Sequence, residues 1–397
     1  MEKLWKYKKI GEVCIVERGA SPRPIDKYIT DNESGINWIK IGDTSDSMYI
    51  TETAQKIIVE GMKKSRYVKP GDFLLSNSMS FGRPYILKID GCIHDGWLVL
   101  RDENALFDKR FLYYYLSSKT TYKKLKSMAV GGVVNNLNSE MVRNVIVPVP
   151  DKEEQSEIAD LFDKIKKILD DRKQELEQLD TLVKSRFVEL FGDPYVNPLK
   201  WKRLKIKDAV TIEPQNGLYK PQSDYVADGT GTPILRIDGF YNGRVTDFGS
   251  LKRLKCSGME QQRYLLLEDD IVINRVNSIE YLGKCAHIKG LLEDTVYESN
   301  MMRMHFDPEH YNPVYICKLL CSQYIYDQIV NHAKKAVNQA SINQKDVLDF
   351  NIYQPPLELQ NQFADFVVSV DKSKSKIQKS LEETQLLFDS LMQKYFG

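Results

Sequence analysis

The chain contains the same segment twice, and this internal repeat constrains its fold more than any other feature of the sequence. The matching pairs are Trp5 with Trp201, Trp38-Ile-Lys-Ile41 with Ile234-Leu-Arg-Ile237, and Pro70-Gly-Asp-Phe-Leu-Leu-Ser76 with Glu268-Asp-Asp-Ile-Val-Ile-Asn274. The offset is 196 residues at the start, 198 at the third pair, and 205 from Leu137 to Phe191-Gly192, which matches Phe396-Gly397. A length of 397 residues also exceeds one ordinary hydrophobic core. We therefore expect two copies of one structural unit.

Each copy changes character at a proline, Pro150 in the first and Pro355 in the second. Before these prolines, short β-branched and aromatic runs alternate with Gly, Pro, Asn and Ser, as in Phe73-Leu-Leu75, Ile271-Val-Ile273 and Val145-Ile-Val147. Such runs predict strands. One helical stretch interrupts them in each copy, around 109–126 and 313–336. The globular part of each copy is therefore expected to be mixed α and β.

After each proline, about 40 residues lack Gly and Pro, and apolar residues recur at alternating steps of four and three. The first stripe is Ile158, Phe162, Ile165, Leu169, Arg172, Leu176, Leu179, Val183, Arg186 and Leu190. The second is Phe363, Val367, Val370, Lys374, Ile377, Leu381, Thr384, Phe388, Leu391 and Tyr395. A repeat of 3.5 residues is typical of a coiled-coil seam, and each helix would be about 60 Å long.

The alternative interpretation of these stripes is that each helix packs on its own globular domain. The stripe is narrow and flanked by charges, which favours a helix as the partner. We therefore expect an antiparallel pair that relates the two halves by a pseudo-twofold axis. The predicted fold class is α+β, with globular domains at 1–150 and 193–355 and long helices at 151–192 and 356–397.

Composition points to a folded protein of the cytoplasm. The sequence has 28% charged and 42% hydrophobic residues, no apolar run long enough to span a membrane, and a charged N-terminal segment unlike a signal peptide. The six cysteines are scattered, so we expect reduced core residues. The five histidines are dispersed, and no metal is predicted because structural zinc needs four converging ligands.

The net charge of +1 conceals an uneven distribution. Residues 1–150 contain 23 basic and 17 acidic residues, whereas residues 193–355 contain 20 of each. An excess of six positive charges is compatible with binding a polyanion, although many ordinary domains carry as much.

No catalytic constellation is recognisable in the sequence. It lacks a P-loop, G-x-G-x-x-G, G-x-S-x-G and H-E-x-x-H. Asp193-Pro194-Tyr195 superficially resembles the Pro-Pro-Tyr motif of amino-methyltransferases, but it lacks the second proline and is interpreted as a linker turn. Pro150-Asp151 fits the start of a nuclease motif without an acceptable partner carboxylate, and Asp151 fits better as a helix cap.

These features together resemble the specificity subunits of Type I restriction-modification systems, over the whole chain. Pro148-Val-Pro-Asp-Lys-Glu-Glu-Gln155 and Gln354-Pro-Pro-Leu-Glu-Leu-Gln360 are similar to the family's Pro-Pro-Leu-x-Glu-Gln helix start, with a valine between the first two prolines in the first copy. Phe191-Gly-Asp-Pro194, followed by Asn197 and Trp201, is similar to the family's junction between the first long helix and the second globular domain.

The resemblance implies a DNA-binding subunit that is not itself an enzyme. Each globular part would be a target recognition domain that reads one half of a bipartite double-stranded DNA site, and the helices would fix the gap between the halves. Half-sites about one helical turn apart, roughly 34 Å, need such a stiff spacer. The implied partners are two methyltransferase subunits and two restriction subunits. These partners would bind S-adenosylmethionine, ATP and Mg, so no cofactor is expected in this chain.

Base readout needs polar side chains on loops that reach the groove edges, whereas phosphate contacts need only positive charge. Loops of this composition lie at 18–23, 76–83 and 135–136 in the first copy and at 215–220, 275–278 and 338–339 in the second. The candidate DNA-binding residues are Arg18, Arg23, Lys40, Asn77, Ser78, Arg83, Asn135, Asn136, Asn216, Lys220, Arg236, Arg275, Asn277 and Asn338. Taken singly, each is more readily explained as an ordinary solvated loop residue, whereas the set together favours DNA binding. Lys40 and Arg236 fit structural ion pairs equally well.

The methyltransferase subunits are expected to bind the long helices. Candidate contacts are the acidic residues at the start of the first helix, Glu153, Glu154, Glu157 and Asp160, although acids favour any helix N-terminus. Two other functions stay open: the specificity portion of a fused nuclease-methyltransferase, and a scaffold that holds proteins. Because the loops of the two copies differ almost completely, we expect an asymmetric DNA target.

Overall fold

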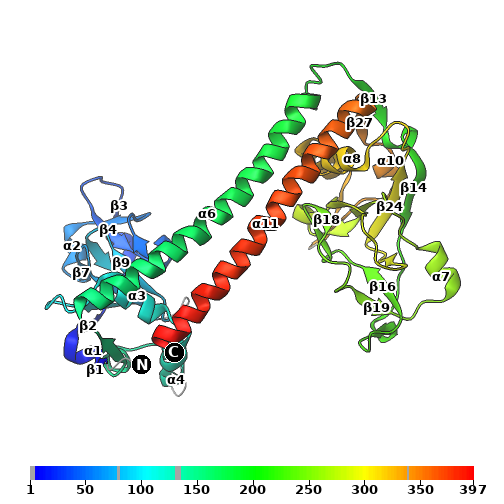
Figure 1. Cartoon of the computed structure of the whole chain (residues 1–397). Helices are drawn as coiled ribbons and strands as arrows, with labels where there is room; N and C mark the ends of the chain where they lie inside the picture. Colours follow the sequence, from blue (N-terminus) through cyan, green and yellow to red (C-terminus); the bar gives the residue numbers. More distant parts are fainter. Residues whose placement is uncertain (1–4, 78–80, 130–135, 338) are drawn as a thin grey trace. The chain divides into compact units, whose positions relative to one another are not determined.

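The computed structural model describes residues 5–77, 81–129, 136–337 and 339–397. The chain divides into two compact units (Figure 1). The first unit contains residues 1–174 and 378–397, and the second contains residues 175–377. The two long helices, α6 (Lys152–Phe191) and α11 (Leu357–Phe396), each contribute one half to each unit.

The first unit is built on two five-stranded sheets and a two-stranded ribbon. One sheet has the order β3 (Ile29–Thr30), β6 (Lys56–Ile57), β4 (Ile36–Ile39), β10 (Gly91–Ile93), β7 (Arg66–Val68). The other has the order β2 (Ile15–Arg18), β11 (Trp97–Arg101), β8 (Phe73–Ser76), β9 (Pro84–Leu87), β5 (Tyr49–Ile50). The ribbon pairs β1 (Lys6–Lys9) with β12 (Ile146–Val149). Short helices α1 (Ile10–Val13), α2 (Val59–Met62) and α5 (Ser139–Arg143) connect these strands.

The second unit has a similar plan, with sheets of six, four, three and two strands. A six-stranded sheet has the order β14 (Val210–Asn216), β24 (Met301–Phe306), β20 (Ile271–Asn274), β22 (Cys285–His287), β18 (Gly243–Val245), β17 (Phe240–Tyr241). A four-stranded sheet has the order β15 (Tyr225–Val226), β19 (Lys252–Leu254), β16 (Thr232–Leu235), β23 (Val296–Tyr297). The smaller sheets are β21 (Val276–Asn277) with β26 (Ala340–Ser341) and β25 (Lys334–Lys335), and β13 (Lys202–Lys205) with β27 (Asn351–Gln354). Helices α7 (Gly258–Arg263) and α10 (Gln344–Leu348) complete the unit.

The predicted strands and the predicted internal helices are confirmed. Strands β8 and β20 contain the apolar runs that begin at Phe73 and Ile271, and both strands are fully buried. Each helical stretch consists of two helices rather than one: α3 (Lys109–Ser117) and α4 (Lys119–Ala129) in the first unit, α8 (Pro313–Leu320) and α9 (Gln323–His332) in the second. Ser118 separates the first pair because its hydroxyl accepts the Thr121 N–H and begins a new helix.

The long helices begin and end close to the predicted residues. Asp151 caps α6, since its Oδ1 accepts the Glu154 N–H at 2.8 Å, and this confirms the cap interpretation of Pro150-Asp151. After α6, Gly192 has φ +77°, and Asp193 Oδ1 accepts the Tyr195 N–H in a turn, as expected of the Asp-Pro-Tyr segment. Trp201 then donates its Nε1–H to the Phe191 carbonyl at 2.9 Å, which returns the chain to the end of the helix.

In the first unit, the start of α6 packs against the end of α11. The ring of Phe162 lies 5.4 Å from that of Phe388 and 5.7 Å from that of Phe396 (centroid distances). Tyr114 of α3 packs on the same Phe162 ring at 5.0 Å. The helix ends therefore pack antiparallel on each other and also on their globular domain.

In the second unit, the end of α6 packs against the start of α11 in the same way. Phe363 lies 5.5 Å from both Phe187 and Phe191, and Tyr315 of α8 packs on those two rings at 5.7 and 4.6 Å. Lys374, a polar member of the predicted stripe, donates to Asp180 at 2.6 Å across the helix pair. Helix pairing is thus confirmed in each unit, and the alternative, packing on the globular domain, holds at the same ends.

Among the described residues, no helix is long and apolar enough to cross a membrane.

Candidate nucleic-acid interface

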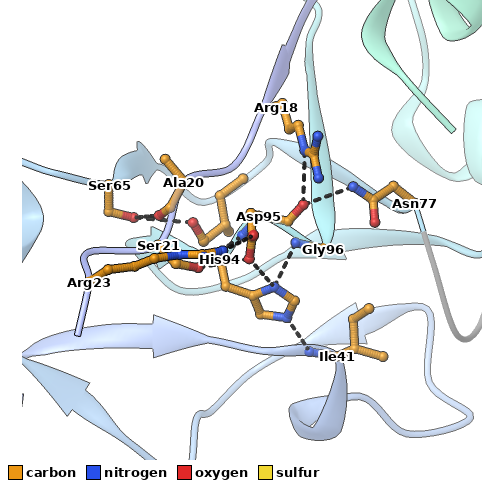
Figure 2. Close-up of polar contacts among 11 residues, drawn as sticks. Arg18, Ala20, Ser21, Arg23, Ile41, Ser65, Asn77, His94, Asp95 and Gly96 are labelled. Atoms are coloured by element: carbon orange, nitrogen blue, oxygen red, sulfur yellow. Dashed lines mark hydrogen bonds and ion pairs between the residues drawn. The ribbon is translucent and has the colours of Figure 1, made fainter. Parts of the chain in front are cut away.

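In the first unit, three of the predicted residues, Arg18, Arg23 and Asn77, converge on Asp95, in the connection between β10 and β11 (Figure 2). The Asp95 carbonyl accepts a hydrogen bond from Asn77 Nδ2 at 2.8 Å and another from Arg18 Nε at 3.1 Å. Its carboxylate accepts from Ser21 Oγ at 2.9 Å and Arg23 Nη2 at 3.2 Å. One residue therefore joins the loop after β2 to the end of β8.

The neighbouring His94 connects the same point to the other sheet. Its Nδ1 lies 2.7 Å from the Gly96 N–H, and its Nε2 lies 3.2 Å from the Ile41 N–H (Figure 2). A neutral imidazole accepts through only one ring nitrogen at a time, so each tautomer makes one of these two bonds. A protonated imidazole makes neither.

Burial and hydrogen bonding act in opposite directions on these two groups. Burial lowers the pKa of His94 below 6.5, although Asp95 and Asp43 favour its charged form. For Asp95, burial opposes the charge, but hydrogen bonds from Ser21 and from a backbone N–H, together with His94 and Arg23, hold the pKa below 3.8. At neutral pH the loop therefore presents a carboxylate beside an uncharged imidazole.

Arg23, Lys40, His94 and Asp95 line one hollow of about 580 Å³. The Arg23 side chain is 81% exposed and that of Asp95 43% exposed. The Lys40 Nζ donates to Gln55 Oε1 at 2.8 Å. Arginine and lysine donate to guanine in protein–DNA complexes, and carboxylates accept from the cytosine amino group, so the hollow contains both kinds of group that base readout uses.

Other candidates of the first unit lie nearby or have internal roles. Asn77 is only 1% exposed, so its side chain positions the loop instead of facing outward. Arg83 is paired with Asp46 at 3.1 Å and also donates to the Ser45 carbonyl. Asn136 is half-buried just before α5. Ser78 and Asn135 lie outside the described residues.

The second unit contains the same arrangement of backbone around Ser299. Arg275, which matches Asn77 in the repeat, donates from Nη1 to the Ser299 carbonyl at 3.1 Å. The Arg275 N–H bonds to the Asn300 carbonyl at 2.8 Å, as the Asn77 N–H bonds to the Gly96 carbonyl at 3.0 Å. Arg275 thus holds the loop that Asn77 holds in the first unit.

Glu298 occupies the place that His94 has in the first unit. Its Oε1 accepts the Ile237 N–H at 2.7 Å, the counterpart of the bond from the Ile41 N–H to His94. Arg236 lies 3.9 Å from the Glu298 carboxylate and donates to the Tyr225 hydroxyl at 3.2 Å. Burial raises the pKa of Glu298 above 4.5, although the hydrogen bond from the Ile237 N–H and the charge of Arg236 favour the carboxylate. The structural ion pair considered for Arg236 is therefore present.

The remaining candidates of the second unit are dispersed. Lys220 is paired with Glu260 at 2.8 Å, and its side chain is only 18% exposed. Asn216 is exposed at the end of β14. Asn277 accepts the Ser278 N–H through its own Oδ1, within a strand that pairs with β26. Asn338 lies outside the described residues.

A glycine at the same position makes the close approach possible in both units. A Cβ on Gly19 would lie 2.0 Å from the His94 carbonyl oxygen, and one on Gly217 would lie 2.3 Å from the Glu298 carbonyl oxygen. Only a residue without a side chain fits there. The N–H groups of Gly19 and Gly217 bond to the carbonyls of Trp97 and Met301, the first residues of β11 and β24. We call these hydrogen-bonded loops, at 17–21 with 94–97 and at 215–219 with 298–301, the loop frames.

Sequence reasoning missed the residues at the centre of each frame. Asp95, His94 and Glu298 were not among the candidates, because their sequence neighbours form no motif. The available indication of these loops in the sequence was the pair of matching glycines, Gly19 and Gly217, because the residues before them share little between the two copies.

The similar helix starts have a structural explanation. Gln155 is fully buried, accepts the Asp108 N–H at 2.7 Å and donates to the carbonyls of Leu106 and Pro150. Gln360 makes the matching bonds in the second unit, with the backbone of Asn312, His310 and Pro355. Each glutamine attaches a long helix to its globular domain.

Two of the four acidic candidates at the start of α6 are engaged within the chain. Glu154 accepts from Trp5 Nε1 at 3.0 Å, and Asp160 accepts from Arg110 at 2.6 Å. Glu153 and Glu157 are exposed.

Two similar α+β units, each with a loop frame and one half of each long helix, define a tandem-repeat protein. Residues 2–179 and 198–384 match the family model described as Type I restriction modification DNA specificity domain. The chain therefore belongs to this family of DNA specificity subunits.

Individual relatives agree with the family match. The chain is 24% identical over 379 residues to the Type I restriction enzyme EcoKI specificity subunit of Escherichia coli K12, covering 89% of this chain and 78% of that one. It is 22% identical over 398 residues to the MjaVIII specificity subunit of Methanocaldococcus jannaschii, covering 95% and 90%. The relatives are specificity subunits of Type I restriction enzymes, a non-catalytic DNA recognition family, as expected from the sequence.

Solved structures share the fold. A chain from a type I R-M system, from a study of its complex assembly and conformational transition, superimposes with a TM-score of 0.62 at 16% identity, covering 99% of this chain and 97% of that one. The S subunit from M. genitalium gives a TM-score of 0.54 at 14% identity, covering 99% and 96%. The predicted α+β fold with two long paired helices is confirmed.

Proposed function

We propose that this chain directs a Type I modification complex to an asymmetric, two-part DNA sequence. Each globular domain reads one half-site with the side chains around its loop frame. The paired helices set the length of the unread spacer. The target recognition domains are proposed at 1–150 and 193–355 and the conserved helices at 151–192 and 356–397, as the repeat predicts.

The observation that carries this proposal is the recurrence of one loop frame with different side chains. The backbone hydrogen bonds of the two frames correspond, yet Asn77, His94 and Asp95 are replaced by Arg275, Glu298 and Ser299. A shared backbone arrangement that holds different side chains in the two copies is the arrangement expected of two domains that read different base pairs.

The charges support different kinds of contact in the two domains. The exposed Arg23 lies beside the Asp95 carboxylate of the first frame, and the partly buried Arg236 lies beside Asp238 and the Glu298 carboxylate of the second. A donor next to an acceptor can match a base pair that presents both in the major groove. Different pairs of groups in the two domains would select different half-sites.

The partners follow from the family. Methyltransferase subunits would bind the long helices, where Glu153 and Glu157 are exposed. Restriction subunits would complete a cleaving complex. S-adenosylmethionine, ATP and Mg would be bound by these partners. A complex that acts on chromosomal DNA would work in the cytoplasm.

The direct test is to express this chain with its cognate methyltransferase subunit in a host without other adenine-N6 methylation. Single-molecule sequencing is expected to find methylation at one two-part motif with a spacer of fixed length. A continuous motif, or no motif, would overturn the proposal.

A domain exchange separates the two reading domains. Replacing residues 1–150 with the corresponding domain of another specificity subunit is expected to change one half of the methylated motif and leave the other half intact. A change in both halves would contradict independent readout.

A further inference from the structure

The two units contain equivalent grooves next to their loop frames. In the first unit, Phe81 and Gly82, just before β9, pack on α4, where Gly82 (φ +70°) lies next to Leu125. In the second, the segment between β20 and β22 packs on α9, where Gly283 (φ +75°) lies next to Ile329. These matching contacts identify the groove along α4 and the groove along α9 as counterparts.

The groove along α4 has a volume of about 770 Å³ and is strongly basic. Its lining residues include no acid and four cations, Arg83, Lys119, Lys123 and Lys126. Arg83 is paired with Asp46 at 3.1 Å and Lys119 with Asp389 at 2.8 Å. Within the part of the chain that the structure describes, Lys123 and Lys126 have no ion-pair partner. Two exposed ammonium groups therefore face this groove without compensation.

The groove along α9 does not carry this positive charge. Its volume is about 420 Å³, and its lining includes Gln323 where the first groove has Lys119. One and two turns further along the helix, Asp327 and Val330 occupy the positions of Lys123 and Lys126. Its lysine, Lys284, is already engaged, because its Nζ donates to the Ile237 carbonyl at 2.6 Å and lies 4.0 Å from the centre of the Tyr241 ring.

We infer that the groove along α4 binds the phosphate backbone of duplex DNA beside the first half-site, and that the second domain has no equivalent phosphate site. This inference rests on the proposed function. Lysine ammonium groups bind phosphates as point charges without reading sequence. The Tyr122 side chain is exposed in the same groove and adds a hydroxyl donor.

The groove is attached directly to the reading loops. The Arg83 carbonyl accepts the Ser76 N–H at 3.1 Å, and Asn77, the next residue, holds Asp95. A phosphate held along α4 would therefore fix the register of the duplex against the first loop frame. The first domain accordingly contributes more of the salt-dependent affinity than the second, in line with its excess of positive charge.

The test uses the chain assembled with its methyltransferase partner and a duplex that carries the methylated motif. The variant Lys123→Gln with Lys126→Gln keeps helix propensity and both ion pairs of the groove. The slope of log Kd against log salt concentration is expected to decrease by about two for this variant. Its affinity for the duplex should be roughly tenfold weaker near 0.15 M salt. The methylated motif should stay the same. An unchanged slope in a variant with the wild-type melting temperature would overturn the inference.

Two further variants make the result specific. Lys63→Gln with Lys64→Gln removes the same charge directly after α2, which Figure 1 draws on the opposite side of the first unit from α4. This control should change the slope by much less, and an equal loss would mean that net charge alone matters. Asp327→Lys with Val330→Lys places ammonium groups along α9 at the positions of Lys123 and Lys126 and is expected to steepen the slope. A slope that stays unchanged here would contradict the equivalence of the grooves.

The probes separate this inference from the proposed function. If wild-type complex methylates no two-part motif, the proposed function fails. If the motif is present but the Lys123 and Lys126 variant binds duplex normally, only the phosphate groove fails. If inorganic phosphate at low millimolar concentration displaces the duplex, and if the affinity does not depend on duplex length, the groove is a small-anion site. That result would also overturn the inference.

Discussion

The side chain of Asn77 donates a 2.8 Å hydrogen bond to the backbone carbonyl of Asp95, and this bond joins the end of β8 to the loop before β11. In the second unit, Arg275 makes the corresponding bond to Ser299. Two chemically different side chains thus support one backbone geometry. Their function is to hold the loop that carries the outward groups.

Asn77→Ala is expected to lower the stability of the first unit by about 1–2 kcal/mol, because it removes a buried hydrogen bond. It should also reduce the sequence specificity of the first half of the methylated motif and leave that of the second half unchanged. Thermal melting and methylome sequencing measure the two effects. Arg275→Ala is the matched variant, with the opposite half affected. A variant that loses specificity in both halves would contradict the separate roles of the frames.

Gln155→Ala is expected to lower the free energy of unfolding by about 3 kcal/mol. The substitution leaves the Asp108 N–H and the Leu106 and Pro150 carbonyls without their hydrogen-bond partner. For a unit of this size the melting temperature should fall by roughly 10 °C. Gln174→Ala, at an exposed position of the same helix, is the control and should melt within about 2 °C of wild type. Equal melting temperatures for the two variants would remove the attachment role of Gln155.

His94 should make the first unit sensitive to mild acid. Burial lowers its pKa below 6.5 in the folded state, so the unfolded chain takes up the proton first as the pH falls. Stability is therefore complete above about pH 6.5 and declines as the pH falls toward the folded-state pKa. His94→Gln can still accept the Ile41 N–H but does not titrate. Its melting temperature should fall less between pH 7.5 and 5.5 than that of wild type, and parallel curves would show that His94 is not responsible.

Insertion of one heptad into both α6 and α11 is expected to lengthen the spacer of the methylated motif. Seven residues add about 10 Å of helix, equivalent to roughly three base pairs. Insertion of whole heptads keeps the apolar seam in register, whereas insertion of four residues in each helix shifts it. The four-residue variant is the control and should methylate poorly. A heptad variant with an unchanged spacer would show that the helices do not set the distance.

Much of the architecture could be predicted because it depends on local periodicity. The stripe from Ile158 to Leu169, and that from Phe363 to Val370, repeats every 3.5 residues, and these residues are buried. Phe187, Phe191 and Phe396 were harder to interpret, since they are absent from the stripe but are buried between a long helix and α3 or α8. Their burial depends on a globular surface that the helix pattern does not encode.

The sequence alone determined the repeat, the strands, the two long helices and the family, because each of these is written in neighbouring residues or in a fixed offset. Only the tertiary structure decided what the polar loop residues do. Asn77 and Asp95 are 18 positions apart, and Ser21 and Asp95 are 74 apart. Whether a polar side chain faces outward or supports a loop depends on which distant backbone groups fold beside it, since buried carbonyl and N–H groups must find partners.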